Sequence, residues 1–248
     1  MKKTFTFLML SLLFLAINAF GQSSIVITPK KTVYTRTGKG LPKEKRTFTV
    51  RYLMFNGAMA PAVKTKLENT LSYWRVFDRT LKDCLADDCG LDSFDYKVNY
   101  NQNGILSVTL MDDHSGAYPD MQSVDLVIDL KTGAEVKFAD AFNSDAKLAE
   151  MVNQKLEVEK KGILKEVAAD KEQNKEAKEW ATEQINGLSF TTESFKEFRM
   201  SPKGVIILYD AEFPHAIQSL QPAGEYLFTY AELKPFIKKN SLLGKIVR

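Results

Sequence analysis

Short segments in which apolar and polar residues alternate dominate the first half of the chain. In residues 46–55, Phe48 and Val50 alternate with polar residues, and residues 94–100 repeat this pattern. An Asn-Gln-Asn-Gly turn sequence follows, and residues 105–111 return as the mainly apolar partner strand. A period of two is typical of a strand with one buried face, and a turn between two such strands indicates a hairpin. The pattern predicts strands at residues 24–36 (one strand or two), 46–55, 94–100, 105–111, 123–130 and 135–138.

Helical periodicity appears in two places. Apolar residues recur every three or four positions from Pro61 to about Cys84, which predicts a single helix with one buried face. A second helical pattern begins near Ala146 and fades into the polar residues 169–176, which form either a solvated helical segment or a break. The apolar face returns at Trp180, so we predict a further helical segment there.

The stretch from Lys203 to Ile237 organises the last part of the chain. An apolar strand at residues 205–209 leads into a loop that contains His215 and two prolines. A second short strand at residues 225–229 runs directly into a short helix. Because prolines and aromatic residues are frequent in this loop, we expect side-chain contacts to order it.

These elements predict the fold class. Strands that follow one another through short turns favour neighbouring antiparallel pairs. We therefore predict an α+β protein in which antiparallel β-meander sheets pack against a few helices. The length of residues 22–248 fits one domain, and two lobes (22–143 and 188–248) joined by a helical segment (144–187) are an alternative.

The N-terminal residues 1–21 have the features of a secretory signal peptide. Lys2 and Lys3 precede an apolar run from Phe5 to Ile17, and Ala19 and Gly21 place small residues before a cleavage site. The run is shorter than the ~20 apolar residues that a membrane-spanning helix requires. We therefore expect a secreted or periplasmic protein without a membrane span after cleavage.

Charge narrows the class of partner. The formal net charge of the whole chain is +3, and it falls by two when Lys2 and Lys3 leave with the signal peptide. A nucleic-acid-binding domain would show a clearly basic surface. We therefore expect no nucleic-acid partner; the oligomeric state is left open by the sequence.

Cys84 and Cys89 are the only cysteines in the chain. In an oxidising compartment such a pair favours a disulfide over a metal site, since no histidine or CxxC motif lies nearby. Five residues along a continuous helix would separate the two Cα atoms by roughly 8 Å, which is too far for a disulfide. The helix is therefore expected to end between them.

Two segments resemble a known family. Residues 115–142 contain a Gly-Ala-Tyr-Pro loop, a strand that ends in Asp-Leu-Lys-Thr-Gly, and an Ala-Asp-Ala-Phe helix entry. Residues 201–237 contain a glycine-led strand, a loop with Phe-Pro-His, and an aromatic strand that enters a helix. Both are similar to the RsiV-like extracellular domain, which occurs in an anti-sigma factor receptor that binds lysozyme and in the non-catalytic part of a peptidoglycan deacetylase.

The resemblance implies an α+β fold of antiparallel strands packed on helices. It covers the C-terminal half well and the N-terminal half more loosely. Tyr118 stands where the family often has histidine, and the second loop carries Phe213-Pro214-His215, which shifts its polar group. The chain contains no recognisable cytoplasmic anti-sigma segment or deacetylase domain, so the resemblance does not imply sigma-factor signalling.

Residues 112–120 concentrate carboxylates beside the first histidine. Asp112, His114 and Asp120 could bind a cation, a sugar or a protein, but a catalytic zinc site needs three protein ligands and the spacing of a calcium loop is missing. These residue types are also common in turns. We therefore predict neither a metal site nor a cofactor.

His215 lies near Glu212, and a histidine beside a carboxylate can act as a general base. The sequence offers no recognisable nucleophile, so a loop histidine that bonds to the backbone is the alternative. If the two loops meet, their aromatic side chains would form a rim of the kind that dominates binding energy. The predicted binding residues are Asp112, His114, Tyr118, Asp120, Glu212, Phe213, His215 and Tyr226.

The sequence therefore favours an exported, non-enzymatic binding domain that acts at the cell envelope. Its expected partner is a cell-wall glycan or a secreted protein such as a lysozyme-like hydrolase. The alternative is a cell-wall or glycan hydrolase that uses His215 with the loop carboxylates. A purely structural periplasmic domain is the third hypothesis.

Overall fold

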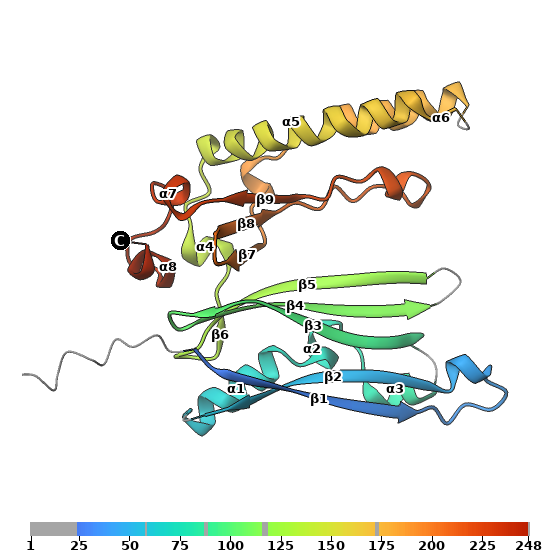
Figure 1. Ribbon diagram of the computed structural model, residues 1–248, viewed down its shortest axis with the longest axis vertical. Coiled ribbons are helices and arrows are strands. Elements are labelled where there is room, and N and C mark those ends of the chain that lie inside the picture. Colours follow the sequence, from blue (N-terminus) through green and yellow to red (C-terminus); the bar gives the residue numbers. More distant parts are fainter. Residues whose placement is uncertain (1–23, 58, 87–88, 116–118, 172–173, 248) are drawn as a thin grey trace, which may run out of the picture.

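The computed structural model describes residues 24–57, 59–86, 89–115, 119–171 and 174–247. The predicted signal peptide (residues 1–21) and Tyr118 lie outside these ranges. The α+β prediction is confirmed: Figure 1 shows one large sheet with helices on one face, and a small sheet beneath a long helical hairpin. The strands are β1 (Val26–Thr35), β2 (Thr47–Asn56), β3 (Leu91–Gln102), β4 (Ile105–Ser115), β5 (Pro119–Asp129), β6 (Ala134–Glu135), β7 (Phe198–Ser201), β8 (Gly204–Leu208) and β9 (Glu225–Phe228).

The large sheet has the order β1-β2-β3-β4-β5-β6. Its β3–β4 hairpin turns at Asn103 and Gly104, whose φ angles of 54° and 75° suit the Asn-Gly pair of a tight hairpin turn. One pairing differs from a pure meander, because β2 and β3 are parallel, with Thr49 beside Ser93. A parallel pair needs a crossover connection, and residues 57–90 provide it.

The segment predicted as a loop at residues 112–120 is mostly strand. β4 continues to Ser115 and β5 begins at Pro119, with Asp112 paired to Gln122 and His114 to Asp120. The polar residues Asp112 and Asp113 made this stretch look like a turn, but backbone pairing with both neighbours outweighs their turn preference. The first predicted binding loop is therefore the end of a long hairpin.

The crossover holds three short helices instead of the single helix predicted to Cys84. They are α1 (Pro61–Thr70), α2 (Tyr73–Val76) and α3 (Leu81–Ala86). Ser72 has extended backbone angles, and Asp78 has a φ of 49°, so the chain changes direction twice. These breaks let Tyr73 pack against Phe94 of β3, with ring centroids 4.4 Å apart, and form the core of this layer.

The predicted disulfide is present. α3 ends at Ala86, as the spacing of the cysteines requires, and the Cα atoms of Cys84 and Cys89 are 4.9 Å apart. Cys84 is fully buried.

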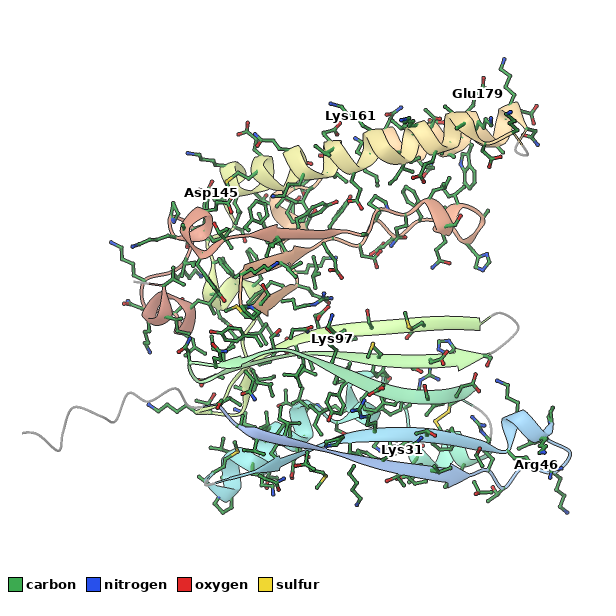
Figure 2. All side chains as sticks on the ribbon, viewed as in Figure 1. Lys31, Arg46, Lys97, Asp145, Lys161 and Glu179 are labelled. Atoms are coloured by element: carbon green, nitrogen blue, oxygen red, sulfur yellow. A yellow bond between two sulfur atoms is a disulfide. The ribbon has the colours of Figure 1, made fainter. Side chains whose placement is uncertain are left out.

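The second layer is the sheet β7-β8-β9 with the helices around it. The remaining helices are α4 (Phe138–Ala141), α5 (Ala146–Ala169), α6 (Lys175–Gly187), α7 (Tyr230–Leu233) and α8 (Leu242–Ile246), with 3-10 turns η1 (Lys43–Lys45), η2 (Thr192–Ser194) and η3 (His215–Leu220). α5 ends at Ala169 and α6 begins at Lys175, so of the two alternatives for this polar stretch the break is the one observed. Figure 2 shows the α5–α6 pair, on which Asp145, Lys161 and Glu179 are labelled, with side chains filling the layer below it.

The two layers join through β7. Arg199 of β7 binds Asp125 of β5 with two hydrogen bonds, of 2.8 Å from Nε and 2.7 Å from Nη2. Its third nitrogen, Nη1, donates to Glu225 of β9 at 3.0 Å. The apolar core beside this group contains Ile105 of β4 and Ile207 of β8, so the layers share one core. Within the described residues, none of the helices combines the length and apolar character needed to cross a membrane.

We expect Arg199→Ala to lower the free energy of unfolding by about 3 kcal/mol, because it leaves the carboxylate of Asp125, only 5% exposed, without its cation. Arg51→Ala is the matched control, since its pair with Asp95 is 43% and 45% exposed and should contribute less than about 1 kcal/mol. Urea unfolding of both variants measures the difference. Equal losses would contradict a structural role for the Arg199 pair.

Candidate functional site

A carboxylate–arginine–histidine cluster lies beneath the hairpin end of the large sheet. Asp112 and His114 are two residues apart on β4, so both face the helices α1–α3. Asp112 Oδ2 lies 3.3 Å from Arg79 Nε, and Asp112 Oδ1 lies 3.7 Å from His114 Nδ1. The Asp112 side chain is fully buried, whereas those of Arg79 and His114 are 21% and 18% exposed. Two predicted binding residues thus meet, but inside the protein.

The break between α2 and α3 places Arg79 in this cluster. Asp78 adopts a left-handed conformation, and Thr80 then starts α3 by accepting a hydrogen bond from the Asp83 N–H at 3.1 Å. Arg79 lies between them, where Nη1 also donates to the carbonyl of Cys89 at 2.8 Å. The same side chain therefore links the buried carboxylate to the disulfide.

The burial of this cluster shifts the pKa values of Asp112 and Tyr73. Burial raises the pKa of Asp112, while the nearby charges of Arg79 and His114 act in the opposite direction. Burial also raises the pKa of the Tyr73 hydroxyl, and the charge of Asp112 adds to the effect. A buried carboxylate beside a cation can hold charge and order the sheet end, but it cannot touch a substrate from outside.

The second predicted site is the loop of residues 210–224, here called the His215 loop. Asp210 Oδ1 accepts hydrogen bonds from the Glu212 N–H and from Gln221 Nε2, both at 2.9 Å. Gln221 Oε1 accepts from the Phe213 N–H at 3.0 Å. Glu212 has a φ of 50°, a conformation that costs a non-glycine residue about 1 kcal/mol. Side-chain bonds on either side of the 3-10 turn η3 therefore fix this loop.

Apolar and polar contacts anchor the His215 loop to α5 and α6. Phe213 and Ile217 pack in a small core with Val167 of α5 and Ile185 of α6. Glu159 of α5 accepts hydrogen bonds from the Ala223 N–H and the Tyr226 hydroxyl, at 2.6 and 2.9 Å respectively.

Gly224 permits the loop to return to the sheet. It has a φ of 64°, and a Cβ at this position would lie 1.9 Å from the carbonyl oxygen of Tyr209. Only glycine fits this close approach.

The aromatic rim predicted from the sequence is wrong for two of its members. Phe213 is 8% exposed and Tyr226 is 4% exposed, so both rings anchor the fold instead of facing solvent. Their apolar neighbours on α5 and α6, which the sequence pattern does not place, explain the burial.

The remaining predicted site residues are distributed over two layers. Glu212 and His215 are exposed on the His215 loop. Asp120 belongs to β5, but its side chain is outside the described part of the structure. Tyr118 is also outside the described residues. In Figure 1 the hairpin end of β4–β5 and the His215 loop belong to different layers and project toward the same side. Their role in binding stays a prediction.

Sequence reasoning missed a second polar group near the disulfide. Lys45 Nζ donates to Asp92 Oδ1 at 2.8 Å and also to the hydroxyl of Ser115, which itself contacts Asp92. A serine beside a lysine can be a nucleophile with its base. Here the lysine donates to both partners, so the group joins η1, β3 and β4. These residues are 23 or more positions apart in the chain, and no sequence pattern links them.

The described residues offer neither a metal site nor a pocket with a clear ligand preference. Among the described residues, no group of three or more histidine, cysteine, aspartate or glutamate side chains is placed to hold a metal ion. An open hollow of about 670 Å³ lies between α5 and α6, lined by Lys175, Lys178, Glu179 and Glu183 among others. Because its lining carries both positive and negative side chains, the hollow does not favour one class of ligand.

Solved structures that share this fold include two of DUF3298 family proteins. A DUF3298 family member from Bacteroides fragilis gives a TM-score of 0.53 at 15% identity, over 90% of this chain and 97% of that chain. A DUF3298 family protein from Pseudomonas aeruginosa gives 0.50 at 15% identity, over 87% and 95%. The sequence matches no protein-family model and no curated protein. At this identity the likeness establishes a common fold.

We expect Arg79→Ala to destabilise the protein by about 3 kcal/mol near neutral pH, because Asp112 would keep a buried charge without its cation. The raised pKa of Asp112 means that the folded state holds its proton more tightly than the unfolded chain. The Asp112 contribution to stability therefore falls as the pH rises from the ordinary pKa of 3.8 through the raised value, and Arg79→Ala steepens this fall.

Chemical denaturation between pH 3 and pH 7 measures this effect. The exposed Arg75→Ala is the control, and Arg79→Ala combined with Asp112→Asn should lose the added pH dependence. A loss for Arg79→Ala that is the same at every pH would show that the Asp112 charge is not involved.

Proposed function

We propose that the mature chain is an exported, non-enzymatic binding domain of the RsiV-like class that acts at the cell envelope. Its partner is a cell-wall glycan or a secreted protein such as a lysozyme-like hydrolase. The features of residues 1–21 that predict a signal peptide support export, and the closed Cys84–Cys89 disulfide is consistent with an oxidising compartment. The shared fold with DUF3298 family proteins is compatible with this class.

The observation that carries the proposal is the construction of the His215 loop. The loop presents exposed Glu212, Pro214 and His215 while Phe213 and Ile217 hold it on the helices. A loop that is ordered before binding loses little conformational entropy when a partner docks. Such loops on a rigid scaffold are where binding residues concentrate.

The burial of Asp112 removes one carboxylate from the set that the hydrolase alternative could use. A glycosidase needs two carboxyl groups that reach the substrate on either side of the scissile bond. Asp112 is fully buried and lies against Arg79, whereas Glu212 lies on the other layer. Asp112 is therefore not available as the carboxylate that the hydrolase alternative would use with His215.

We expect the purified chain from Gln22 onward to bind peptidoglycan sacculi or lysozyme in a pull-down without releasing soluble sugar. Combined Glu212→Ala and His215→Ala substitutions should weaken binding about tenfold, the effect of losing roughly two polar contacts. The paired control is Lys30→Ala with Lys31→Ala on β1, at the far side of the large sheet. Thermal unfolding checks that every variant is folded.

Two outcomes would overturn the proposal. One is the absence of binding to both sacculi and lysozyme together with hydrolytic turnover. The other is equal weakening by the β1 control, which would remove the His215 loop from the interface.

A further inference from the structure

The outer edge of β5 is open over most of its length. β6 covers only Ile128 and Asp129, and the Val136 N–H extends this pairing to the carbonyl of Val127. On the opposite side, the Leu130 N–H bonds to Gly104 in the β3–β4 turn. Backbone groups alternate along a strand, so the odd-numbered residues of β5 point away from β4. Met121 and Ser123 therefore direct their N–H and C=O groups outward.

These outward groups are accessible. Met121 is 68% exposed, and Gln122 and Ser123 are also exposed. Within the described residues, no backbone hydrogen bond joins the outer side of Met121 or Ser123 to another strand. Two donors and two acceptors thus stand in the geometry that an added strand requires.

The opposite edge of the sheet is protected, which makes the β5 edge unusual in this molecule. β1 carries Pro29, Lys30 and Lys31 at its centre, the residues that natural edge strands use to prevent pairing with other chains. Figure 2 labels Lys31 on this outer strand, far from the second layer. Residues 121–124 of β5 are Met-Gln-Ser-Val, with neither proline nor lysine.

The charges beside the β5 edge define the partner. Asp113 is exposed and pairs with Met121 across the ladder. Glu225 is 47% exposed and shares Arg199 with Asp125 of β5. Burial raises the pKa of Glu197, and the nearby charge of Asp125 raises this pKa further. The cations beside these carboxylates are Lys196, next to Glu197, and Arg199, which is already bound to Asp125 and Glu225. Asp113, Asp125, Glu197 and Glu225 outnumber them, so negative charge is in excess beside the edge.

We propose that residues 121–124 of β5 bind an extended, basic segment of a partner protein by strand addition. This inference rests on the proposed binding function and deepens it, since paired backbone groups select a peptide over a glycan. A second copy of this chain would bring the same carboxylates to the edge, and like charges would oppose its pairing.

A model peptide tests the proposal on the chain from Gln22 onward. The probe is a capped seven-residue peptide of alternating lysine and valine, with fluorescence anisotropy to follow binding. We expect this peptide to bind, and the glutamate–valine counterpart to bind at least about tenfold more weakly. N-methylation of two successive central residues removes one N–H donor from each hydrogen-bonding edge of the peptide, and it should cause a similar loss of affinity. Equal affinity of the three peptides, or no binding, would overturn the proposal.

Variants locate the contact. Ser123→Pro removes an outward N–H and should weaken binding about tenfold, whereas Ser123→Ala keeps this group and should bind as the parent does. If Ser123→Pro does not fold, amide hydrogen exchange of the parent chain decides. The peptide should then slow exchange at Met121 and Ser123 and leave Thr32 and Val33 of β1 unchanged. Protection at β1, or at neither edge, would contradict the assignment.

Analytical sedimentation tests the remaining possibility, which is that a second copy of this chain occupies the β5 edge. A dimer that Ser123→Pro converts to monomer would show that a second copy occupies the edge, against the proposal. The chain could bind the peptide at β5 but bind neither sacculi nor lysozyme. That result would reject these two partners in the proposed function and would leave the β5 site supported.

Discussion

The arrangement of the two layers depends on the bidentate pair between Arg199 and Asp125. The guanidinium group crosses from the small sheet to the large one and accepts only a narrow range of geometries, because two parallel hydrogen bonds fix a planar fork. Apolar packing beside it tolerates sliding, whereas a buried ion pair does not. The pair therefore sets the orientation of β7 relative to β5, and with it the surroundings of the β5 edge.

Arginines perform a similar task near the disulfide. Arg79 joins the Cys89 carbonyl to the buried Asp112, and Arg36 donates to the carbonyls of Cys84 and Leu91. A short cystine loop contributes only about 2 kcal/mol through chain entropy. Its greater effect here is geometric, since it holds carbonyl groups where two cationic side chains can reach them. Covalent and ionic constraints thus reinforce one another at the hairpin end of the large sheet.

Much of the fold was predictable because local patterns and tertiary structure agree. The alternation around Phe48 and Val50, the Asn103-Gly104 turn and the cysteine spacing each express one local preference that the structure keeps. Asp112 shows the limit of such reasoning: an aspartate among turn-forming residues becomes a buried strand residue because Arg79, 33 positions earlier, supplies its counter-charge. No periodicity reports a contact of that kind. The same holds for Phe213 and Tyr226, whose burial depends on helices that the sequence pattern cannot position.

The small core that holds the His215 loop on α5 and α6 has a consequence for motion. Phe213 and Ile217 pack with Val167, Ala181 and Ile185 at the far end of the α5–α6 pair. This cluster is distinct from the core that joins the two sheets, although the half-buried Leu188 packs against both. A small cluster of this kind forms its own cooperative unit, with a lower opening free energy than the body of the protein. Helix α6 and the His215 loop should therefore fluctuate together as a subdomain. A molecule that binds the His215 loop would then also slow the fraying of α6, although it makes no contact with that helix.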